Sequence, residues 1–283
     1  MFKKKGSETM NQLACPKCQL PLNIVGNSYK CQSNHTYDIS KSKYINLLLN
    51  PDKNTNNPGD NKDSLTCRKN FLNNGYYNII SETLNQYIKN LHLDKANILD
   101  LGCGEGFYLS RLKEEIKQNN YEYYGLDISK IAIDMATKYT KDINWLVANS
   151  KNIPLLDNSI DLILALFTVV NHKELNRILN DNGYIIHVTA NPYHLVELKS
   201  LIYDKIIVKS DTYLKLPFTI KDSFDLKRTI SINNKEDCLN LLKMTPHYYH
   251  IKKENRYILD TIDKLDVTID IKFTIYIKPY IDI

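Results

Sequence analysis

The sequence predicts an α/β protein, with a mainly parallel sheet covered by helices on both faces and a small metal-binding module ahead of it. Residues 98–106, ILDLGCGEG, have the pattern of a buried strand that runs into a glycine-rich turn, and residues 107–117 continue as an amphipathic helix. Strand-like and helix-like segments then alternate as far as residue 188. A metal-ligand spacing precedes both features near the N-terminus.

The metal-binding module is predicted from Cys15, Cys18, Cys31 and His35, which form C-x2-C-x12-C-x3-H. Two thiolates from one turn and a Cys/His pair from another can surround one tetrahedral ion, and these ligands favour zinc. Four protein ligands close the coordination shell, so the zinc is expected to be structural. The alternative is a pair of disulfides or free thiols. The expected small core of the module consists of Leu20, Leu22, Tyr29 and Tyr37.

The positive charge of the chain is concentrated at its N-terminus. Residues 1–50 contain seven lysines and two acidic residues, a net charge of +5 that equals the net charge of the whole chain. This distribution favours contact between the module and the phosphates of a nucleic acid. The alternative is a solvated tail, because Lys3, Lys4 and Lys5 precede any folded pattern.

The length and apolar content indicate one full domain with a small appendage, because 283 residues with 43% apolar side chains can build a sizeable core. The longest apolar run, residues 162–170, is too short for a bilayer, which takes about 20 residues. The first residues lack the apolar stretch of a secretory signal. We therefore expect a cytoplasmic protein without a membrane partner.

The domain boundaries are predicted from residues 50–63, NPDKNTNNPGDNKD, whose Asn, Pro, Gly and Asp content is typical of a linker. Residues 1–49 then form the zinc-binding module, and residues 64–283 form the second domain. Helices are expected over residues 64–72 and from Tyr77 onward.

A nucleoside site is predicted where the first strand ends. Asp100, Gly102, Gly104 and Gly106 supply a turn that a ligand can approach closely. The next strand, residues 121–127, ends in an acidic residue that lies 23 positions after Gly104 and could accept both ribose hydroxyls. That residue is Asp127, and Asn149, which follows a third strand, is expected beside the adenine ring. The glycines form GxGxG without a GxGxxG, which favours S-adenosylmethionine over NAD.

The remaining elements are expected to complete the sheet. Residues 175–179 are predicted as a helix that Asn182 and Gly183 end, and residues 184–188 as the next strand. Strand-like runs at residues 227–233 and 266–278 should close the sheet in the antiparallel sense. Four side chains are predicted to be structural rather than functional, namely Cys67, Cys103, Cys238 and His187.

A family resemblance extends along nearly the whole chain. The stretches that carry it are CPKCQLPL, CQSNHTYD, KYINLL, NPGD, FLNNGYY, ILDLGCGEGFY, YGLDISKIAI, NPYHLVELKSLIYD and LLKMTPHYY. Together they resemble the bacterial 23S rRNA (guanine-N1)-methyltransferases of the RlmA type. The resemblance implies a class I, Rossmann-like, S-adenosylmethionine-dependent methyltransferase fold with an N-terminal zinc ribbon. It also implies methylation of a guanine in a hairpin of 23S ribosomal RNA near the nascent-peptide tunnel; some members confer macrolide resistance, and the family tends to dimerise.

By the same resemblance, the zinc ligands are Cys15, Cys18, Cys31 and His35, and the cofactor contacts are Tyr77, Gly104, Glu105, Asp127 and His194. For His194 the alternative is a histidine at a helix start that bonds to the backbone.

The chain departs from the family in one place: it has Thr168-Val169-Val170 where the family usually has Ala-Pro-Cys after the fourth strand. The sequence does not identify the general base. His172 is a candidate, and the alternative is a solvent-facing residue that opens a helix. Methylation of another RNA position or of a small molecule, and a non-catalytic RNA-binding role, remain open as alternative functions.

Overall fold

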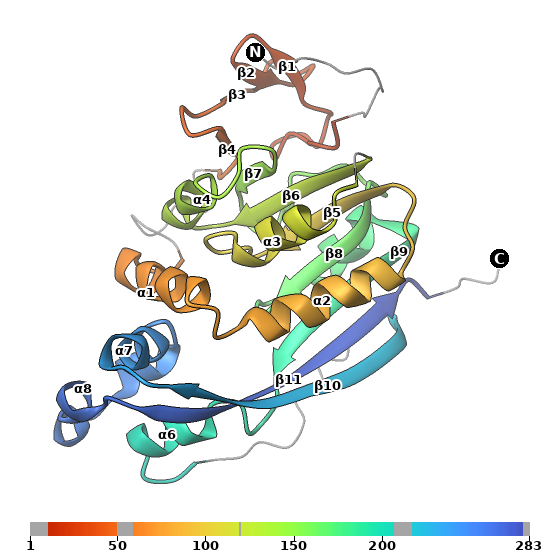
Figure 1. Cartoon of the computed structure of the whole chain (residues 1–283). Coiled ribbons are helices and arrows are strands. Elements are labelled where there is room, and N and C mark those ends of the chain that lie inside the picture. The colour runs from red at the N-terminus through yellow and green to blue at the C-terminus, as the bar shows by residue number, and fades with distance from the viewer. Residues whose placement is uncertain (1–10, 50–58, 119, 207–216, 280–283) are drawn as a thin grey trace.

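The computed structural model describes residues 11–49, 59–118, 120–206 and 217–279 of the chain. Figure 1 shows the N-terminal module at one end of a large twisted sheet and a long two-stranded ribbon at the other. The residues 50–58 of the predicted linker and the lysines at positions 3, 4 and 5 lie outside the described residues. No helix within the described ranges is long and apolar enough to cross a membrane.

The N-terminal module contains a three-stranded antiparallel sheet of β1 (Asn23–Val25), β2 (Ser28–Lys30) and β3 (Thr36–Asp38). The chain then leaves this small sheet through β4 (Tyr44–Asn46), which pairs in parallel with β7 (Asn144–Val147) at the edge of the main sheet. The predicted module of residues 1–49 therefore contributes its last strand to the main sheet.

The main sheet has eight strands in the order β10-β11-β9-β8-β5-β6-β7-β4. The six strands from β4 to β9 in this order are parallel, whereas β11 runs antiparallel to both β9 and β10. This arrangement confirms the predicted parallel sheet with an antiparallel finish. The remaining strands are β5 (Ala96–Leu101), β6 (Tyr121–Asp127), β8 (Ile160–Leu166), β9 (Leu179–Ala190), β10 (Thr219–Ile232) and β11 (Leu265–Ile277).

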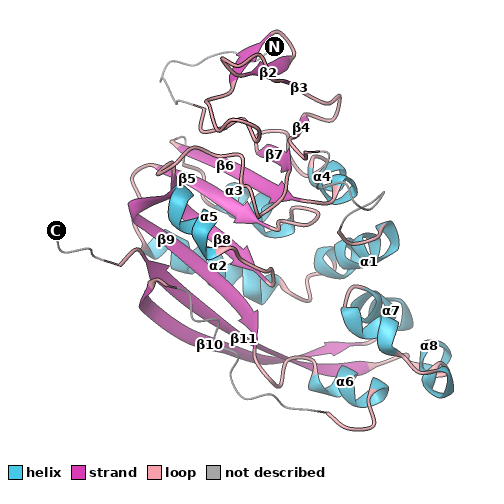
Figure 2. Cartoon of the chain, turned by 180° about the vertical axis from the view of Figure 1, so that it is seen from behind, coloured by secondary structure: helices cyan, strands magenta, loops and turns pink. Residues whose placement is uncertain are grey.

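Helices cover both faces of the sheet, as Figures 1 and 2 show. Helices α2, α3, α4, α6 and α7 contribute to a large core on one face, and α5 packs with the N-terminal module on the other. Short 3-10 helices follow α7. The bounds are α1 (Lys62–Asn73), α2 (Asn78–Asn90), α3 (Phe107–Glu115), α4 (Lys130–Ala136), α5 (His172–Ile178), α6 (Val196–Ile202), α7 (Lys235–Lys243), η2 (Pro246–His250), η3 (Lys253–Asn255) and α8 (Ile258–Thr261).

The boundary between α5 and β9 differs from the prediction. Residues 182 and 183 do not end the helix, because β9 already begins at Leu179, whose φ of −72° and ψ of 132° are extended. Leu179 pairs with Ile160 of β8, and the pairing shifts register before Leu162. Pairing with β8 therefore overrides the local turn preference of Asn-Gly.

The N-terminal module packs directly against the main sheet. Leu13 forms a bridge with Leu155, and the Ala14 backbone N–H donates to the carbonyl of Pro154 at 3.0 Å. Leu13 and Leu22 are buried in the same apolar cluster as the central strand residue Leu101. The module and the sheet thus share one core.

Candidate metal centre and cofactor cavity

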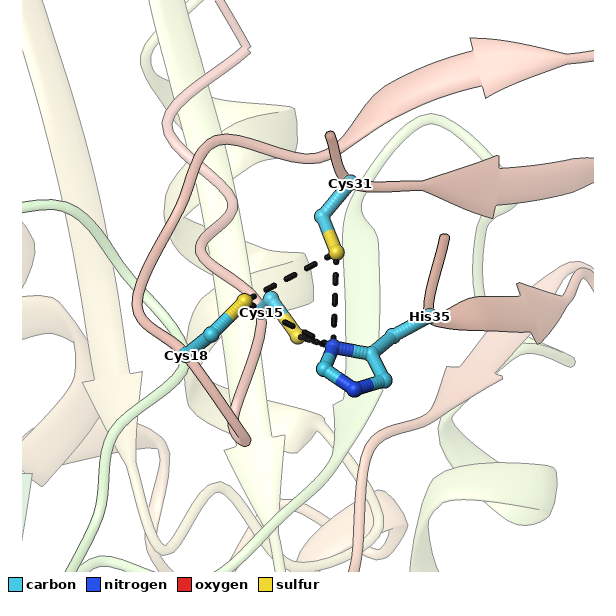
Figure 3. Close-up of side chains that lie close together, drawn as sticks. All are labelled: Cys15, Cys18, Cys31 and His35. Atoms are coloured by element: carbon cyan, nitrogen blue, oxygen red, sulfur yellow. Dashed lines mark hydrogen bonds between the residues drawn. The ribbon is translucent and has the colours of Figure 1, made fainter. Parts of the chain in front are cut away.

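The predicted zinc ligands converge on one point in the N-terminal module. Figure 3 shows the side chains of Cys15, Cys18, Cys31 and His35 turned toward one another. The His35 Nδ1 lies 3.4 Å from the sulfur of Cys15 and 3.5 Å from the sulfurs of Cys18 and Cys31. The sulfurs of Cys18 and Cys31 are 3.7 Å apart.

These separations fit a zinc ion. With Zn–S bonds of about 2.3 Å and Zn–N bonds of about 2.0 Å, a tetrahedron places its ligand atoms roughly 3.5 to 3.8 Å apart. The six cysteines form no disulfide, which removes the alternative of a disulfide pair. The Tyr37 hydroxyl lies 3.3 Å from the Cys15 sulfur and can donate to it, so the thiolate receives support from the module core.

The other three cysteines lie away from this cluster. Cys103 and Cys238 are buried, Cys67 is partly buried, and burial raises the pKa of all three thiols. The described residues contain one Cys/His/acid group with metal-ligand geometry, the cluster around His35. This agrees with the structural interpretation of Cys67, Cys103 and Cys238. His187, buried within β9, also agrees with its predicted place in the core.

A cavity of about 620 Å³ lies at the carboxyl ends of β5, β6 and β8. This edge of a parallel sheet is where α/β folds bind ligands, and the volume suits a nucleoside-sized molecule. Seven of the predicted cofactor residues line it: Tyr77, Asp100, Gly102, Gly104, Glu105, Asp127 and His194.

The glycine turn after β5 is fixed by the predicted acidic residue of β6. The Asp127 carboxylate accepts the backbone N–H of Gly104 at 3.0 Å through one oxygen and that of Ser129 at 2.8 Å through the other. Gly102 has a φ of 72°, and a Cβ there would lie 2.5 Å from the Thr168 hydroxyl. Thr168, the first residue of the segment that departs from the family, therefore packs against the turn and depends on glycine at 102.

Three carboxyl groups gather beside the turn. Burial, followed by the charges of Asp127 and Glu105, raises the pKa of Asp100 from 3.8 to about 8. Burial also raises the pKa of Glu105, while Arg68 opposes this shift. The Glu105 side chain is only 2% exposed, and its Oε1 has no hydrogen-bond partner among the described residues. An unpaired buried oxygen at this position fits a site that a ligand donor completes.

Tyr77 and His194 line the cavity together, with the Tyr77 hydroxyl 3.5 Å from His194 Nε2. The His194 Nδ1 accepts the backbone N–H of Asp270 at 3.2 Å, and burial lowers its pKa to about 4. His194 is therefore a neutral ring that both bonds to the backbone and lines the cavity. The backbone bond of the alternative is present, and the ring also lies where the predicted cofactor contact would be, which stays a prediction.

Other predicted residues lie outside the cavity wall. Asn149 is not among the lining residues, and its side-chain oxygen accepts the Lys151 backbone N–H at 3.0 Å. Gly106 begins α3, and a Cβ there would lie 2.7 Å from the Trp145 ring, so Gly106 serves packing. His172 is exposed on the first turn of α5 and does not line the cavity, which favours its alternative, solvent-facing interpretation.

Sequence reasoning missed several lining residues because they come from separate elements. Arg68 of α1 lies 2.5 Å from the Asp60 carboxylate and donates to the Met244 carbonyl at 3.3 Å. Phe167 and Lys199 also line the cavity. No local spacing relates these side chains, although Lys199 lies within NPYHLVELKSLIYD, one of the stretches that carry the resemblance. The cavity as a whole, with Asp127, the unpaired Glu105 oxygen and Arg68, fits S-adenosylmethionine.

Comparisons with known proteins agree with this geometry. A zinc-ribbon family model described as "RlmA, N-terminal" matches residues 13–55, and a model described as "Methyltransferase domain" matches residues 98–183. The first match contains all four predicted zinc ligands, and the second contains the glycine turn and Asp127.

Proteins with similar sequences cover much of the chain, and one of them covers nearly all of it. A protein of Bacillus subtilis named putative 23S rRNA (guanine-N(1)-)-methyltransferase is 27% identical over 97% of this chain and 100% of its own length. The 23S rRNA (guanine(748)-N(1))-methyltransferase of Streptomyces fradiae is 31% identical over 66% of each chain. The structure of the PH0226 protein from Pyrococcus horikoshii covers 72% of this chain with 17% identity and a TM-score of 0.47, and 91% of that chain is covered.

The zinc cluster, the cofactor cavity and the matches over both parts lead to one assignment. The chain belongs to the RlmA-type methyltransferases, in which an N-terminal zinc ribbon precedes a class I domain that uses S-adenosylmethionine.

Proposed function

We propose that this chain transfers a methyl group from S-adenosylmethionine to N1 of a guanine in a hairpin of 23S ribosomal RNA. The observation that carries the proposal is that the zinc ribbon and the cofactor cavity belong to one packed body, in a chain whose relatives are named as guanine-N1 methyltransferases. A ribbon that only assisted folding of a small-molecule enzyme would not need the net positive charge found in residues 1–50.

The cavity wall supports a set of cofactor contacts. The Asp127 carboxylate, already oriented by two backbone N–H groups, has remaining lone pairs for the ribose hydroxyls. The unpaired Glu105 oxygen accepts a donor of the cofactor, and the Arg68 guanidinium lies close enough to Gly104 to bind a cofactor carboxylate. Asn149 and Gly106 support the surrounding structure instead.

When bound, S-adenosylmethionine supplies a methyl group on a positively charged sulfur. This methyl group is already reactive, so its transfer depends mainly on alignment with the acceptor atom. The chain provides that orientation through a turn whose backbone is fixed by Asp127 and by the packing of Thr168 on Gly102. The Asp100 and Glu105 carboxyl groups also place acceptor oxygens and partial negative charge beside the turn.

The RNA contact extends beyond the cavity to the zinc ribbon. Lys17 and Lys41 are exposed on the ribbon, and so are the apolar side chains of Ile24 and Val25 in β1. Lysine ammonium groups bind backbone phosphates without sequence preference. The ribbon would then hold the hairpin while the cavity receives one base.

The cellular setting is part of the same proposal. A ribosomal RNA substrate supports action in the cytoplasm, without a membrane partner. The family resemblance supports a homodimer and an effect on macrolide sensitivity. Light scattering of the purified protein and drug-susceptibility tests of an expressing strain check these two points.

The substrate class can be tested with labelled S-adenosylmethionine and two acceptor fractions, ribosomal RNA and a small-metabolite extract. We expect label in 23S RNA, released as 1-methylguanosine on digestion. Label confined to the metabolite fraction would assign the chain to small-molecule methylation. Label in another RNA nucleoside would keep the RNA substrate but change the acceptor.

A further inference from the structure

Phe167 adopts a backbone conformation that is rare for a bulky residue. It lies directly after β8, at the end of a strand that points into the cavity, and it has a positive φ of 54°. A bulky side chain rarely occupies this backbone region, and such outliers concentrate at functional sites. The ring is also 44% exposed although it lines the cavity. The chain therefore holds an aromatic ring open to the cavity at an energetic cost.

His194 supports this ring from one side. The Phe167 and His194 ring centroids are 6.1 Å apart, and the rings are inclined by only 20°. The His194 ring is held by its hydrogen bonds to Asp270 and Tyr77. Phe167 therefore packs against a rigid, neutral ring. The part of Phe167 turned away from His194 is then available to a flat ligand.

Lys199 of α6 provides a cation at the same end of the cavity. Its side chain is half-buried, and no hydrogen bond or ion pair to its ammonium group is found among the described residues. The charged and titratable groups that face it are Asp270 of β11, His194 and His247 of η2. Burial lowers the pKa of Lys199, and the carboxylate of Asp270 opposes that shift. The amine is thus a donor group that an acceptor on a ligand could pair with.

We propose that the acceptor guanine stacks on the open face of Phe167 and directs its O6 toward the Lys199 ammonium group. The inference rests on the proposed function and names the part of the cavity that selects the base. An aromatic ring stacks on any base, whereas an ammonium group has only donors. It therefore favours guanine, whose O6 is an acceptor, over adenine, which presents an amino group at the equivalent position.

The same placement assists the methyl transfer. The N1 proton of guanine leaves to water, the N1 electron pair forms the bond to the methyl carbon, and the electrons of the carbon–sulfur bond remain on sulfur. As the proton leaves, negative charge spreads over N1 and O6. The Lys199 ammonium group lies where it can stabilise that charge, so it contributes more to the transition state than to the ground state.

The stacking part is tested with Phe167→Ala, compared with Phe167→Tyr, which keeps a stacking ring. The matched control is Tyr193→Ala, since Tyr193 is 50% exposed and does not line the cavity. We expect Phe167→Ala to lower kcat/KM for RNA roughly 5- to 150-fold, as loss of one base–aromatic stack does. Phe167→Tyr and Tyr193→Ala should stay within about 3-fold, and S-adenosylmethionine affinity should be unchanged in all three.

The Lys199 part is tested with Lys199→Met and Lys199→Arg over a range of pH. We expect Lys199→Met to lower kcat more than 10-fold near pH 7, with a smaller deficit at higher pH, where the N1 proton leaves more readily. Lys199→Arg should restore most of the rate. Inosine substituted for the target guanosine retains O6 and should remain a substrate.

Two results would overturn this inference while leaving the proposed function intact. One is a wild-type enzyme that forms 1-methylguanosine, together with full activity in Phe167→Ala and Lys199→Met. Another is a loss in both variants that is matched by weaker S-adenosylmethionine binding, because the residues would then belong to the cofactor site. Failure of the wild-type enzyme to form 1-methylguanosine would instead contradict the proposed function.

Discussion

Asp127 is the acidic residue that the sequence predicts for ribose binding, and it lines the cavity. Its carboxylate accepts two backbone N–H groups, which orient it. We predict that Asp127→Ala weakens S-adenosylmethionine binding by about 1 to 3 kcal/mol, the cost of leaving polar partners unpaired. Isothermal titration calorimetry measures the change.

The control for that substitution is Asp161→Ala. Asp161 also accepts a backbone N–H, that of Asn97 at 2.8 Å, but it does not line the cavity. The Asp161→Ala substitution should lower the melting temperature and leave the affinity for S-adenosylmethionine unchanged. Equal affinity of Asp127→Ala and wild type would count against the ribose assignment.

Asp100 makes stability depend on pH. Its pKa is about 8 in the folded chain and near 3.8 when exposed, so the folded state retains a proton that the unfolded state loses. The folded chain should therefore lose stability as pH rises from about 4 to about 8. We predict that Asp100→Asn removes the pH dependence that Asp100 causes. The free energy of unfolding of the variant, relative to that of wild type, should then rise with pH by up to about 1.4 kcal/mol per pH unit.

Urea unfolding at several pH values measures that difference. The pKa of His194 is lowered to about 4, so His194 makes the folded chain gain stability as pH rises from about 4 to about 6.5. This contribution is present in both proteins. The comparison between Asp100→Asn and wild type therefore isolates the aspartate. A constant difference at all pH values would mean that Asp100 is not protonated in the folded chain.

At the scale of elements, the zinc ribbon is bonded to the main sheet through β4 and shares an apolar cluster with its central strands. We predict one zinc per chain, and we expect chelation or the Cys15→Ser Cys18→Ser double variant to lower the melting temperature of the whole chain in a single transition. Metal analysis and differential scanning calorimetry measure both effects.

Cys67→Ser is the matched control, since Cys67 is a partly buried thiol of α1 outside the metal cluster. It should retain both the zinc and a melting temperature close to that of wild type. Purified protein that lacks zinc yet unfolds at an unchanged temperature would remove the assignment.

The elements show what the sequence could and could not predict. Local spacing was sufficient for the zinc ligands and for the turn at Gly102 and Gly104, because residues that act together there lie close along the chain. The extent of β9 was missed because pairing with β8 outweighs the Asn-Gly turn signal. Arg68, Phe167 and Lys199 come from three separate segments, and only the tertiary fold brings them to one cavity.

At the scale of the whole molecule, the ribbon and the cavity belong to one body, so RNA bound at one can reach the other. We predict that the Lys17→Gln Lys41→Gln variant weakens RNA binding and reduces the slope of log affinity against log salt by about 1 per lysine. Filter binding at several salt concentrations measures the slope.

Removing the ribbon altogether would expose the shared core, so charge substitution is the more suitable test. The control variant is Lys95→Gln Lys264→Gln, which alters two exposed lysines of the methyltransferase domain. An unchanged slope in the ribbon variant would place the main phosphate contacts elsewhere.

Methylation of guanine N1 in 23S ribosomal RNA by this chain can be read directly from the RNA. Methylation at N1 blocks the pairing edge, so reverse transcriptase should stop one nucleotide before the modified base. The direct measurement is primer extension on 23S RNA from a bacterium that lacks its own guanine-N1 enzyme and expresses this chain or its Asp127→Ala variant. We predict a stop at a guanine in the tunnel-entrance hairpin with the wild-type chain and a weaker stop with the variant. Methyl incorporation into RNA without any such stop would contradict methylation at guanine N1.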